Sequence, residues 1–111
     1  AYGASKAALE RATQGLAAEL QGSGVTVNAL SPYKIALTES AAAVARQMAV
    51  QHPDWIEPVE MMAEACYLLI AGSLSGGITH SRALLQLLQS PLHGLDGVTV
   101  MGDALTLAAL E

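Results

Sequence analysis

Charged residues are scarce in this chain, making up 14% of its 111 residues, against roughly 25% in an average soluble domain. Lysine and arginine number only five and never cluster, and the formal net charge is −5. Nucleic-acid-binding domains need basic clusters that neutralise phosphates, so this class is excluded. Low charge combined with 52% hydrophobic residues also excludes a disordered tail.

Long apolar runs are missing as well. The longest apolar stretches, such as residues 65–71, are much shorter than the roughly 18 residues that a membrane-spanning helix needs. No basic segment followed by an apolar run opens the chain, so we expect no signal peptide. Cys66 is the single cysteine and has no partner for an internal disulfide. We therefore expect a cytoplasmic protein without a membrane partner.

The first third of the chain has the pattern of an α/β unit. Apolar residues at steps of three and four predict a helix over residues 2–20, and Gly22 to Gly24 are expected to end it. The β-branched run from Val25 to Leu30 then predicts a strand, which Pro32 ends. A helix, a glycine turn and a strand in this order indicate a parallel α/β fold.

Two further helices are expected later, over residues 39–50 and from Pro58 to Gly72. Short strands are expected near residues 81–85 and 98–101, and residues 104–110 form an apolar tail. The helix after Pro58 carries an apolar stripe that we expect to face the core, formed by Val59, Met62, Ala63, Cys66, Tyr67 and Ile70.

The most informative residues open the chain, in the run Tyr2-Gly3-Ala4-Ser5-Lys6. Residues four apart share one face of a helix, so the Tyr2 phenol and the Lys6 ammonium are expected to be neighbours. A free phenol is a poor base at neutral pH, and a nearby ammonium favours the phenolate. Such a pair can handle the proton of a carbonyl/alcohol couple while a cofactor carries the hydride.

Together with its surroundings, this motif resembles the short-chain dehydrogenase/reductase family. The resemblance rests on Tyr-x-Ala-Ser-Lys-Ala-Ala, an alanine-rich helix and Gly-Val-Thr-Val-Asn-Ala-Leu-Ser-Pro. Residues 32–38 are similar to the family's nicotinamide-side loop, residues 58–65 to its late helix and residues 77–88 to its last strand region. Residues 1–111 would then form the C-terminal part of a single Rossmann-like domain with a doubly wound parallel sheet.

The resemblance implies an NAD- or NADP-dependent oxidoreductase that acts on a small carbonyl or alcohol substrate. It assigns Tyr2 as general acid/base, and it assigns Lys6 to favour the phenolate and bind the nicotinamide ribose. It places Pro32, Ile35 and Thr38 on the cofactor side, where Pro32 shapes the loop and Ile35 acts through its backbone. The glycine-rich pyrophosphate turn and the catalytic serine would belong to an N-terminal half, which is an expected partner.

The chain departs from the family pattern at three places. Tyr33 stands where glycine is usual, and the loop is one residue longer before Thr38. His80 replaces a glycine at the start of the last strand region, and no Gly-Gly pair follows that strand. These departures concern the details of cofactor binding.

Other readings of the same residues stay open. The chain would alternatively be a non-catalytic remnant that serves as a structural or oligomerisation module, and a homo-oligomer is expected from the resemblance in either case. Met48, His52 and Trp55 either line a substrate pocket or are ordinary packing. Cys66 is expected in the core, and Asn28 is expected to bond neighbouring backbone. The three histidines lack partners at ligand spacing, so no metal site is expected.

Overall fold

The computed structural model describes residues 1–36, 38–39 and 42–102 and shows an α/β chain, which confirms the expected class. The helices are α1 (Tyr2–Glu19), α2 (Ala42–Gln51), the 3₁₀ helix η1 (Pro53–Trp55), α3 (Val59–Ala71) and α4 (Ser81–Leu87). The strands are β1 (Ala29–Ser31), β2 (Ile35–Ala36), β3 (Ile56–Glu57), β4 (Ile78–His80), β5 (Leu92–His93) and β6 (Val100–Gly102).

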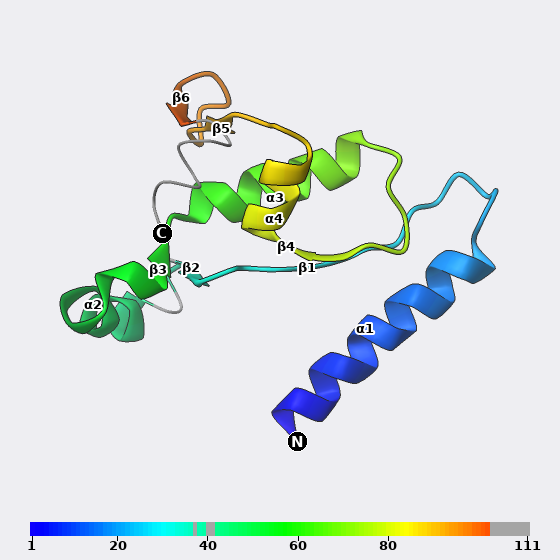
Figure 1. Cartoon of the computed structure of the whole chain (residues 1–111), viewed down its shortest axis with the longest axis horizontal. Helices are drawn as coiled ribbons and strands as arrows, with labels where there is room; N and C mark the ends of the chain where they lie inside the picture. The colour runs from blue at the N-terminus through cyan, green and yellow to red at the C-terminus, as the bar shows by residue number, and fades with distance from the viewer. Residues whose placement is uncertain (37, 40–41, 103–111) are drawn as a thin grey trace.

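The described strands form three separate pairs, which are compatible with part of a Rossmann-like fold and leave the doubly wound sheet a prediction. β1 and β4 are parallel, with Leu30 opposite Thr79 and Ser31 opposite His80. β2 and β3 are also parallel, and β5 and β6 are antiparallel. In Figure 1, α3 and α4 lie on one side of the β1–β4 pair and α1 lies on the other side.

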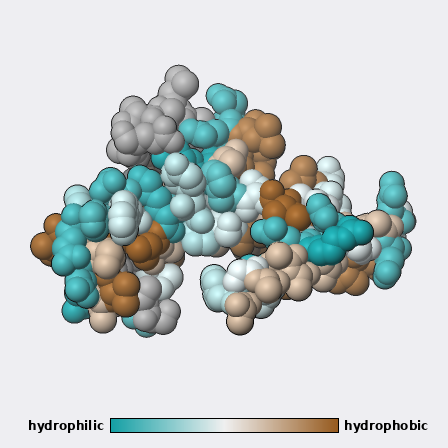
Figure 2. All heavy atoms as spheres, turned by 60° about the horizontal axis from the view of Figure 1, so that its bottom comes forward, coloured by the Kyte–Doolittle hydropathy of each residue, from teal (hydrophilic) through white to brown (hydrophobic). Residues whose placement is uncertain are grey.

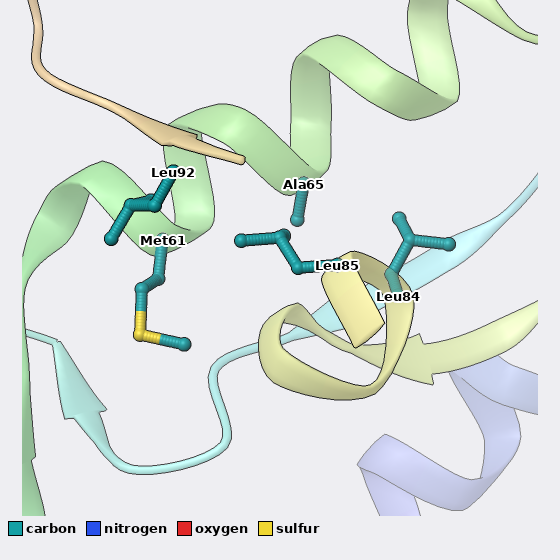
Figure 3. Close-up of a cluster of buried hydrophobic side chains, with 5 residues drawn as sticks. All are labelled: Met61, Ala65, Leu84, Leu85 and Leu92. Carbon is teal, nitrogen blue, oxygen red and sulfur yellow. The ribbon is translucent and has the colours of Figure 1, made fainter. Parts of the chain in front are cut away.

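A small core lies between α3, α4 and β5. Met61 and Ala65 of α3 meet Leu84 and Leu85 of α4, and Leu92 of β5 closes the cluster (Figure 3). Burying these apolar side chains is the main favourable contribution to holding the two helices together. The cluster draws on residues 61–92 only, and α1 adds no member to it.

The predicted orientation of α3 is wrong. Cys66 is exposed, and so are Tyr67 at 63% and Ile70 at 78%, whereas Met61 and Ala65 face the core. Both sides of this helix are apolar, so periodicity alone does not decide which one packs inward. The structure turns Ala63, Cys66, Tyr67 and Ile70 of the expected stripe outward, whereas Val59 and Met62 are half-buried.

Two strand predictions also need correction. Only Ala29–Ser31 pairs as β1, because residues 25–28 lie against a loop instead: the Val27 amide donates to Ser75 Oγ and its carbonyl accepts from the Gly76 amide. Residues 81–87 form the helix α4 and not a strand. The His80 ring caps this helix, since its Nδ1 accepts from the Ala83 amide at 3.1 Å.

The remaining boundaries are close to expectation. The helix from Pro58 to Gly72 is confirmed as α3, and α1 ends just before the Gly22 to Gly24 turn, whose two glycines have positive φ. The helix expected over 39–50 is α2, and the strand expected over 98–101 is β6. The apolar tail at 104–110 lies outside the described residues.

The fold is open and leaves much apolar surface in contact with water. The chain exposes 7235 Å², against roughly 5,800 Å² expected for a compact protein of this mass. Figure 2 shows hydrophobic side chains on the outer surface in several places. The exposed large hydrophobic residues include Leu9, Leu16, Val25, Tyr67, Ile70 and Ile78. No helix in the described part of the chain is long and apolar enough to cross a membrane.

Candidate functional site

Tyr2 and Lys6 are neighbours on the first turns of α1, as their spacing predicts. The Lys6 ammonium lies 5.3 Å from the centre of the Tyr2 ring, within the range of a cation–π contact. Tyr2 is 76% exposed, so its hydroxyl is open to a ligand. Ser5 lies between them in the sequence and donates its hydroxyl to the Tyr2 carbonyl at 2.7 Å, which occupies it with the helix backbone.

A groove of about 470 Å³ runs between α1 and the β1–β4 pair. Because β1 and β4 are parallel, Ser31 and His80, a register pair, end at the same edge, and both line this groove. Ligands of open α/β sheets commonly bind beyond the carboxyl ends of parallel strands. The residues that line the groove include Tyr2, Lys6, Leu9, Ser31, Pro32 and His80.

The donor set of this groove fits the nicotinamide half of NAD(P). An exposed phenol and an ammonium are suited to the hydroxyl groups of a ribose. The phenol can donate or accept a hydrogen bond, and the ammonium can donate one. Leu9 and Pro32 add apolar wall for a flat ring, and the volume lies in the usual range for ligand pockets.

The three loop residues expected on the cofactor side do not share one groove. Pro32 lines the groove of Tyr2 and Lys6, whereas Ile35 lines a second groove of about 650 Å³ together with Tyr33 and Trp55. The Thr38 amide donates to the Ala36 carbonyl of β2 at 3.0 Å. The structure therefore brings Tyr2, Lys6 and Pro32 together and places Ile35 and Thr38 further along the loop.

The loop that begins at Tyr33 is attached to the body of the protein by two residues that the sequence analysis did not identify. Glu57 and Ser81 are buried, with exposures of 3% and 0%. The amide of Tyr33 donates to Ser81 Oγ, and the amide of Lys34 donates to Glu57 Oε2. Glu57 and Ser81 are 24 residues apart, so no local spacing indicates that they meet. The one visible signal is an acidic residue next to the apolar Ile56 in a strand.

His80 and Tyr33, two of the departures from the family pattern, contact each other. Their ring centres are 4.8 Å apart, and the Arg82 guanidinium lies 5.4 Å from the Tyr33 ring centre. Tyr33 is thus packed against the end of β4 and the start of α4. A glycine at position 33 would have no side chain for this contact, so the loop is anchored in a way that the usual family pattern does not provide.

Of the three residues considered for a substrate pocket, His52 and Trp55 contact each other, and Trp55 lines a groove. His52 stacks on Trp55 with ring centres 3.9 Å apart, and Trp55 lines the second groove beside Tyr33. Among the described residues, no group of three or more histidine, cysteine, aspartate or glutamate side chains is arranged to hold a metal ion. Asn28 bonds to backbone, as expected, through the Leu74 carbonyl and the Gly77 amide.

A comparison with protein-family models adds independent information. The model described as enoyl-(acyl carrier protein) reductase matches residues 1–87, which include both grooves and the Glu57–Ser81 pair. No curated protein and no solved structure matches the chain.

Proposed function

Because the chain belongs to this enoyl-(acyl carrier protein) reductase family of short-chain dehydrogenases/reductases, we propose that it carries the acid/base site of an NAD(P)-dependent oxidoreductase. The observation that supports the proposal most is the juxtaposition of Tyr2 and Lys6 on one groove, at the carboxyl ends of two parallel strands. The family makes an oxidoreductase the expected class, and the groove contributes the phenol and the ammonium proposed for the proton transfer.

Tyr2 is the group that moves the proton. NAD(P)H, when bound, supplies the hydride that adds to the carbonyl carbon of the substrate. Tyr2 donates its hydroxyl proton to the carbonyl oxygen, so that an alcohol forms and a phenolate is left, which regains a proton from solvent. In the oxidising direction the Tyr2 phenolate accepts the alcohol proton instead.

Lys6 supports this proton transfer by charge. Its ammonium lies 5.3 Å from the centre of the Tyr2 ring, so a positive charge is close to the group proposed to give up the proton. The same ammonium carries N–H donors suited to the hydroxyls of the nicotinamide ribose. Pro32 closes the groove on the β1 side, and Ile35 and Thr38 contact the cofactor further along the loop.

The site is proposed to work together with a nucleotide-binding half of the same domain. Within the described residues β1 pairs with β4 alone, so that each of these strands keeps an open edge. Open parallel edges and exposed apolar side chains such as Leu16 and Ile78 are costly in water unless further strands and helices cover them. A sheet continued at these edges would be doubly wound and would carry the pyrophosphate site.

The substrate is proposed to be a small carbonyl or alcohol compound. The description of the matching family names an enoyl thioester reductase, in which the substrate also carries a carbonyl. Negative charge develops on an oxygen in both reactions, so the Tyr2–Lys6 pair serves either one. The two classes are separated by assaying NADPH and NADH oxidation with a ketone panel and with a short enoyl thioester.

The second candidate function is a non-catalytic module for assembly, and the exposed outer face of α3 is the observation that favours it. Cys66, Tyr67 and Ile70 lie on that face without cover from described residues. A homo-oligomer that packs this face would bury it. This reading needs no proton transfer at Tyr2, which is how the two candidates are told apart.

The deciding experiment replaces Tyr2 by phenylalanine in the complete protein that includes the nucleotide-binding half. We expect the Tyr2→Phe variant to lose about a hundredfold or more in kcat, because general acid catalysis contributes on that scale. Binding of NAD(P)H, followed by its fluorescence, is expected to change by less than about twofold, since the phenol is only one of many contacts. Tyr67→Phe is the matched control, because Tyr67 lies on the exposed face of α3. Full turnover of Tyr2→Phe contradicts the proposed role of Tyr2, whereas a wild-type complete protein without any turnover favours the assembly module.

A further inference from the structure

We infer that Glu57 and Ser81 are positioning residues, which together hold the backbone of the loop after Pro32 in the shape that the cofactor side of the site requires. The inference rests on the proposed function, because it assigns this loop to NAD(P). The pair is called the Glu57–Ser81 clamp below.

The clamp consists of one buried carboxylate and one buried hydroxyl that together hold two consecutive backbone amides. Ser81 Oγ donates to Glu57 Oε1 at 2.9 Å and accepts from the Tyr33 amide at 3.3 Å. The other carboxylate oxygen, Glu57 Oε2, accepts from the Lys34 amide at 3.2 Å. Each oxygen of the carboxylate therefore has a donor, and the hydroxyl both donates and accepts.

The burial of these groups explains why the arrangement is specific. Glu57 is 3% exposed and Ser81 is 0% exposed, and a buried carboxylate is unfavourable unless it accepts hydrogen bonds. The loop amides supply one of these bonds directly and a second through Ser81. Another path of residues 33–34 would take the Lys34 amide from Glu57 Oε2 and the Tyr33 amide from Ser81 Oγ, so the clamp favours one loop conformation.

The surroundings of the clamp reinforce the same conformation. Glu57 belongs to β3, which is paired with β2, so that Ala36 lies opposite Glu57 and Ile35 opposite Ile56. Ser81 is the first residue of α4, directly after His80, whose ring packs on Tyr33. Three segments distant in sequence thus meet at the two amides.

The location of the clamp connects it to the cofactor. Pro32, which lines the groove of Tyr2 and Lys6, directly precedes the two clamped amides. Ile35, the residue assigned to act through its backbone, directly follows them. Fixing residues 33 and 34 therefore fixes the direction in which the chain leaves Pro32 and the orientation of the Ile35 peptide. Glu57 and Ser81 act on the cofactor through the loop and do not touch it themselves.

The test compares Ser81→Ala with Ser90→Ala in the complete protein. Ser90 is a matched control, because it is also buried, at 8% exposure, and its hydroxyl also donates to a glutamate, Glu64. It lies next to β5, however, and bonds no residue of the loop after Pro32. Three quantities are measured: deuterium exchange of the peptide covering residues 32–36, the Kd for NADH and for NADPH, and kcat separately from the cofactor KM.

The clamp predicts a result that a merely structural role does not. We expect Ser81→Ala to raise exchange in residues 32–36 about tenfold, because the Tyr33 amide loses its acceptor and Glu57 loses the hydroxyl that holds it toward the Lys34 amide. Cofactor Kd and KM are expected to rise about tenfold while kcat changes by less than about twofold. This combination is expected when a variant weakens cofactor binding and leaves the chemical step unchanged. Ser90→Ala is expected to leave all three quantities at the wild-type level, even where both variants lower Tm alike.

Other outcomes overturn the inference in distinguishable ways. Unchanged exchange and unchanged cofactor Kd in Ser81→Ala show that the clamp does not hold the loop. Faster exchange with unchanged Kd shows that the loop does not serve the cofactor. Should Ser81→Ala not fold, Glu57→Gln, which keeps the size of the side chain, is measured in its place against Glu64→Gln. Wild-type protein that binds neither NADH nor NADPH overturns the proposed function, and the cofactor role of the clamp with it, while the exchange data still report on the loop.

Discussion

Asn28 and Gly77 fit against each other through a single oxygen atom. The Gly77 amide donates to Asn28 Oδ1 at 3.0 Å, and a Cβ atom added to Gly77 would lie only 3.1 Å from that same oxygen and 2.9 Å from the Leu74 side chain. The other end of the Asn28 amide group donates to the Leu74 carbonyl at 2.8 Å. This contact joins the segment before β1 to the loop before β4, directly beside the first register pair of the two strands.

The first prediction concerns this contact between Asn28 and Gly77. Asn28→Ala removes both hydrogen bonds and should lower the free energy of unfolding by about 1 kcal/mol. Gly77→Ala should be destabilising by a similar amount, about 1 kcal/mol, because the new methyl group displaces the Asn28 oxygen. The measurement is urea denaturation. Gly15→Ala is the control of opposite sign, since nothing lies within 4 Å of its added Cβ and alanine is the better helix former by about 1 kcal/mol. Equal effects of Gly77→Ala and Gly15→Ala on the free energy of unfolding would contradict the stabilising role of the Asn28–Gly77 contact.

The second prediction concerns the core between α3 and α4. Leu85 is 0% exposed and lies in the five-residue cluster, so Leu85→Ala should lower the free energy of unfolding by about 2–5 kcal/mol. Leu87→Ala on the same helix is the control, because Leu87 is 73% exposed and its truncation should cost less than about 0.5 kcal/mol. Both are measured by the shift of the denaturation midpoint. Similar shifts for the two leucines would show that α4 packs in another orientation.

The third prediction concerns pH. Donation by the Thr99 hydroxyl and by the amides of Val98 and Thr99 lowers the pKa of the Asp96 carboxyl from 3.8 to about 2. These hydrogen bonds go to the ionised Asp96 carboxylate. They therefore stabilise the turn at residues 96–99 fully above pH 3.8, and this stabilisation is lost as the pH falls toward 2. An NMR titration of the Val98 and Thr99 amide shifts should show a midpoint near 2. Thr99→Val removes the strongest of these donors and should move the midpoint upward, and a midpoint unaffected by it contradicts the assignment.

The fourth prediction tests the proposed oligomer. Ile70 is 78% exposed on the outer face of α3, and a charge placed there would be buried without a partner if this face packs against a second copy. Ile70→Glu should therefore raise the fraction of monomer, measured by light scattering after size exclusion. Val50→Glu, at an equally exposed position of α2, should leave the size distribution unchanged. A wild-type protein that is already monomeric at all concentrations rules out this use of the α3 face.

What the sequence predicts well in this chain is what depends on near neighbours. The approach of Lys6 to Tyr2 follows from a separation of four residues on one helix. The end of α1 follows from glycines with positive φ at positions 22 and 24. The start of α3 follows from Pro58, which has no amide hydrogen to lose.

What the sequence does not predict is decided by partners far along the chain. The outward position of Cys66 depends on α4 packing against the opposite face of α3, and both faces of that helix are apolar. The run at 25–28 is β-branched, yet its backbone bonds to the 75–76 loop. The Glu57–Ser81 contact spans 24 residues, so it is visible only once β3 and α4 have been placed. The doubly wound sheet stays a prediction, because its remaining strands are not among the described pairs.

The position of the core has a consequence for how the protein responds to heat. All five core residues lie between positions 61 and 92, whereas Tyr2 stands at the far end of α1, a helix that contributes to none of that cluster. The proposed acid/base group and the most firmly packed part of the chain therefore belong to regions that do not have to melt together. Warming should move α1 away from β1 while α3 and α4 remain packed. Thermal inactivation would then begin below the melting temperature and be reversed on cooling, with the intact core as the template on which α1 settles again.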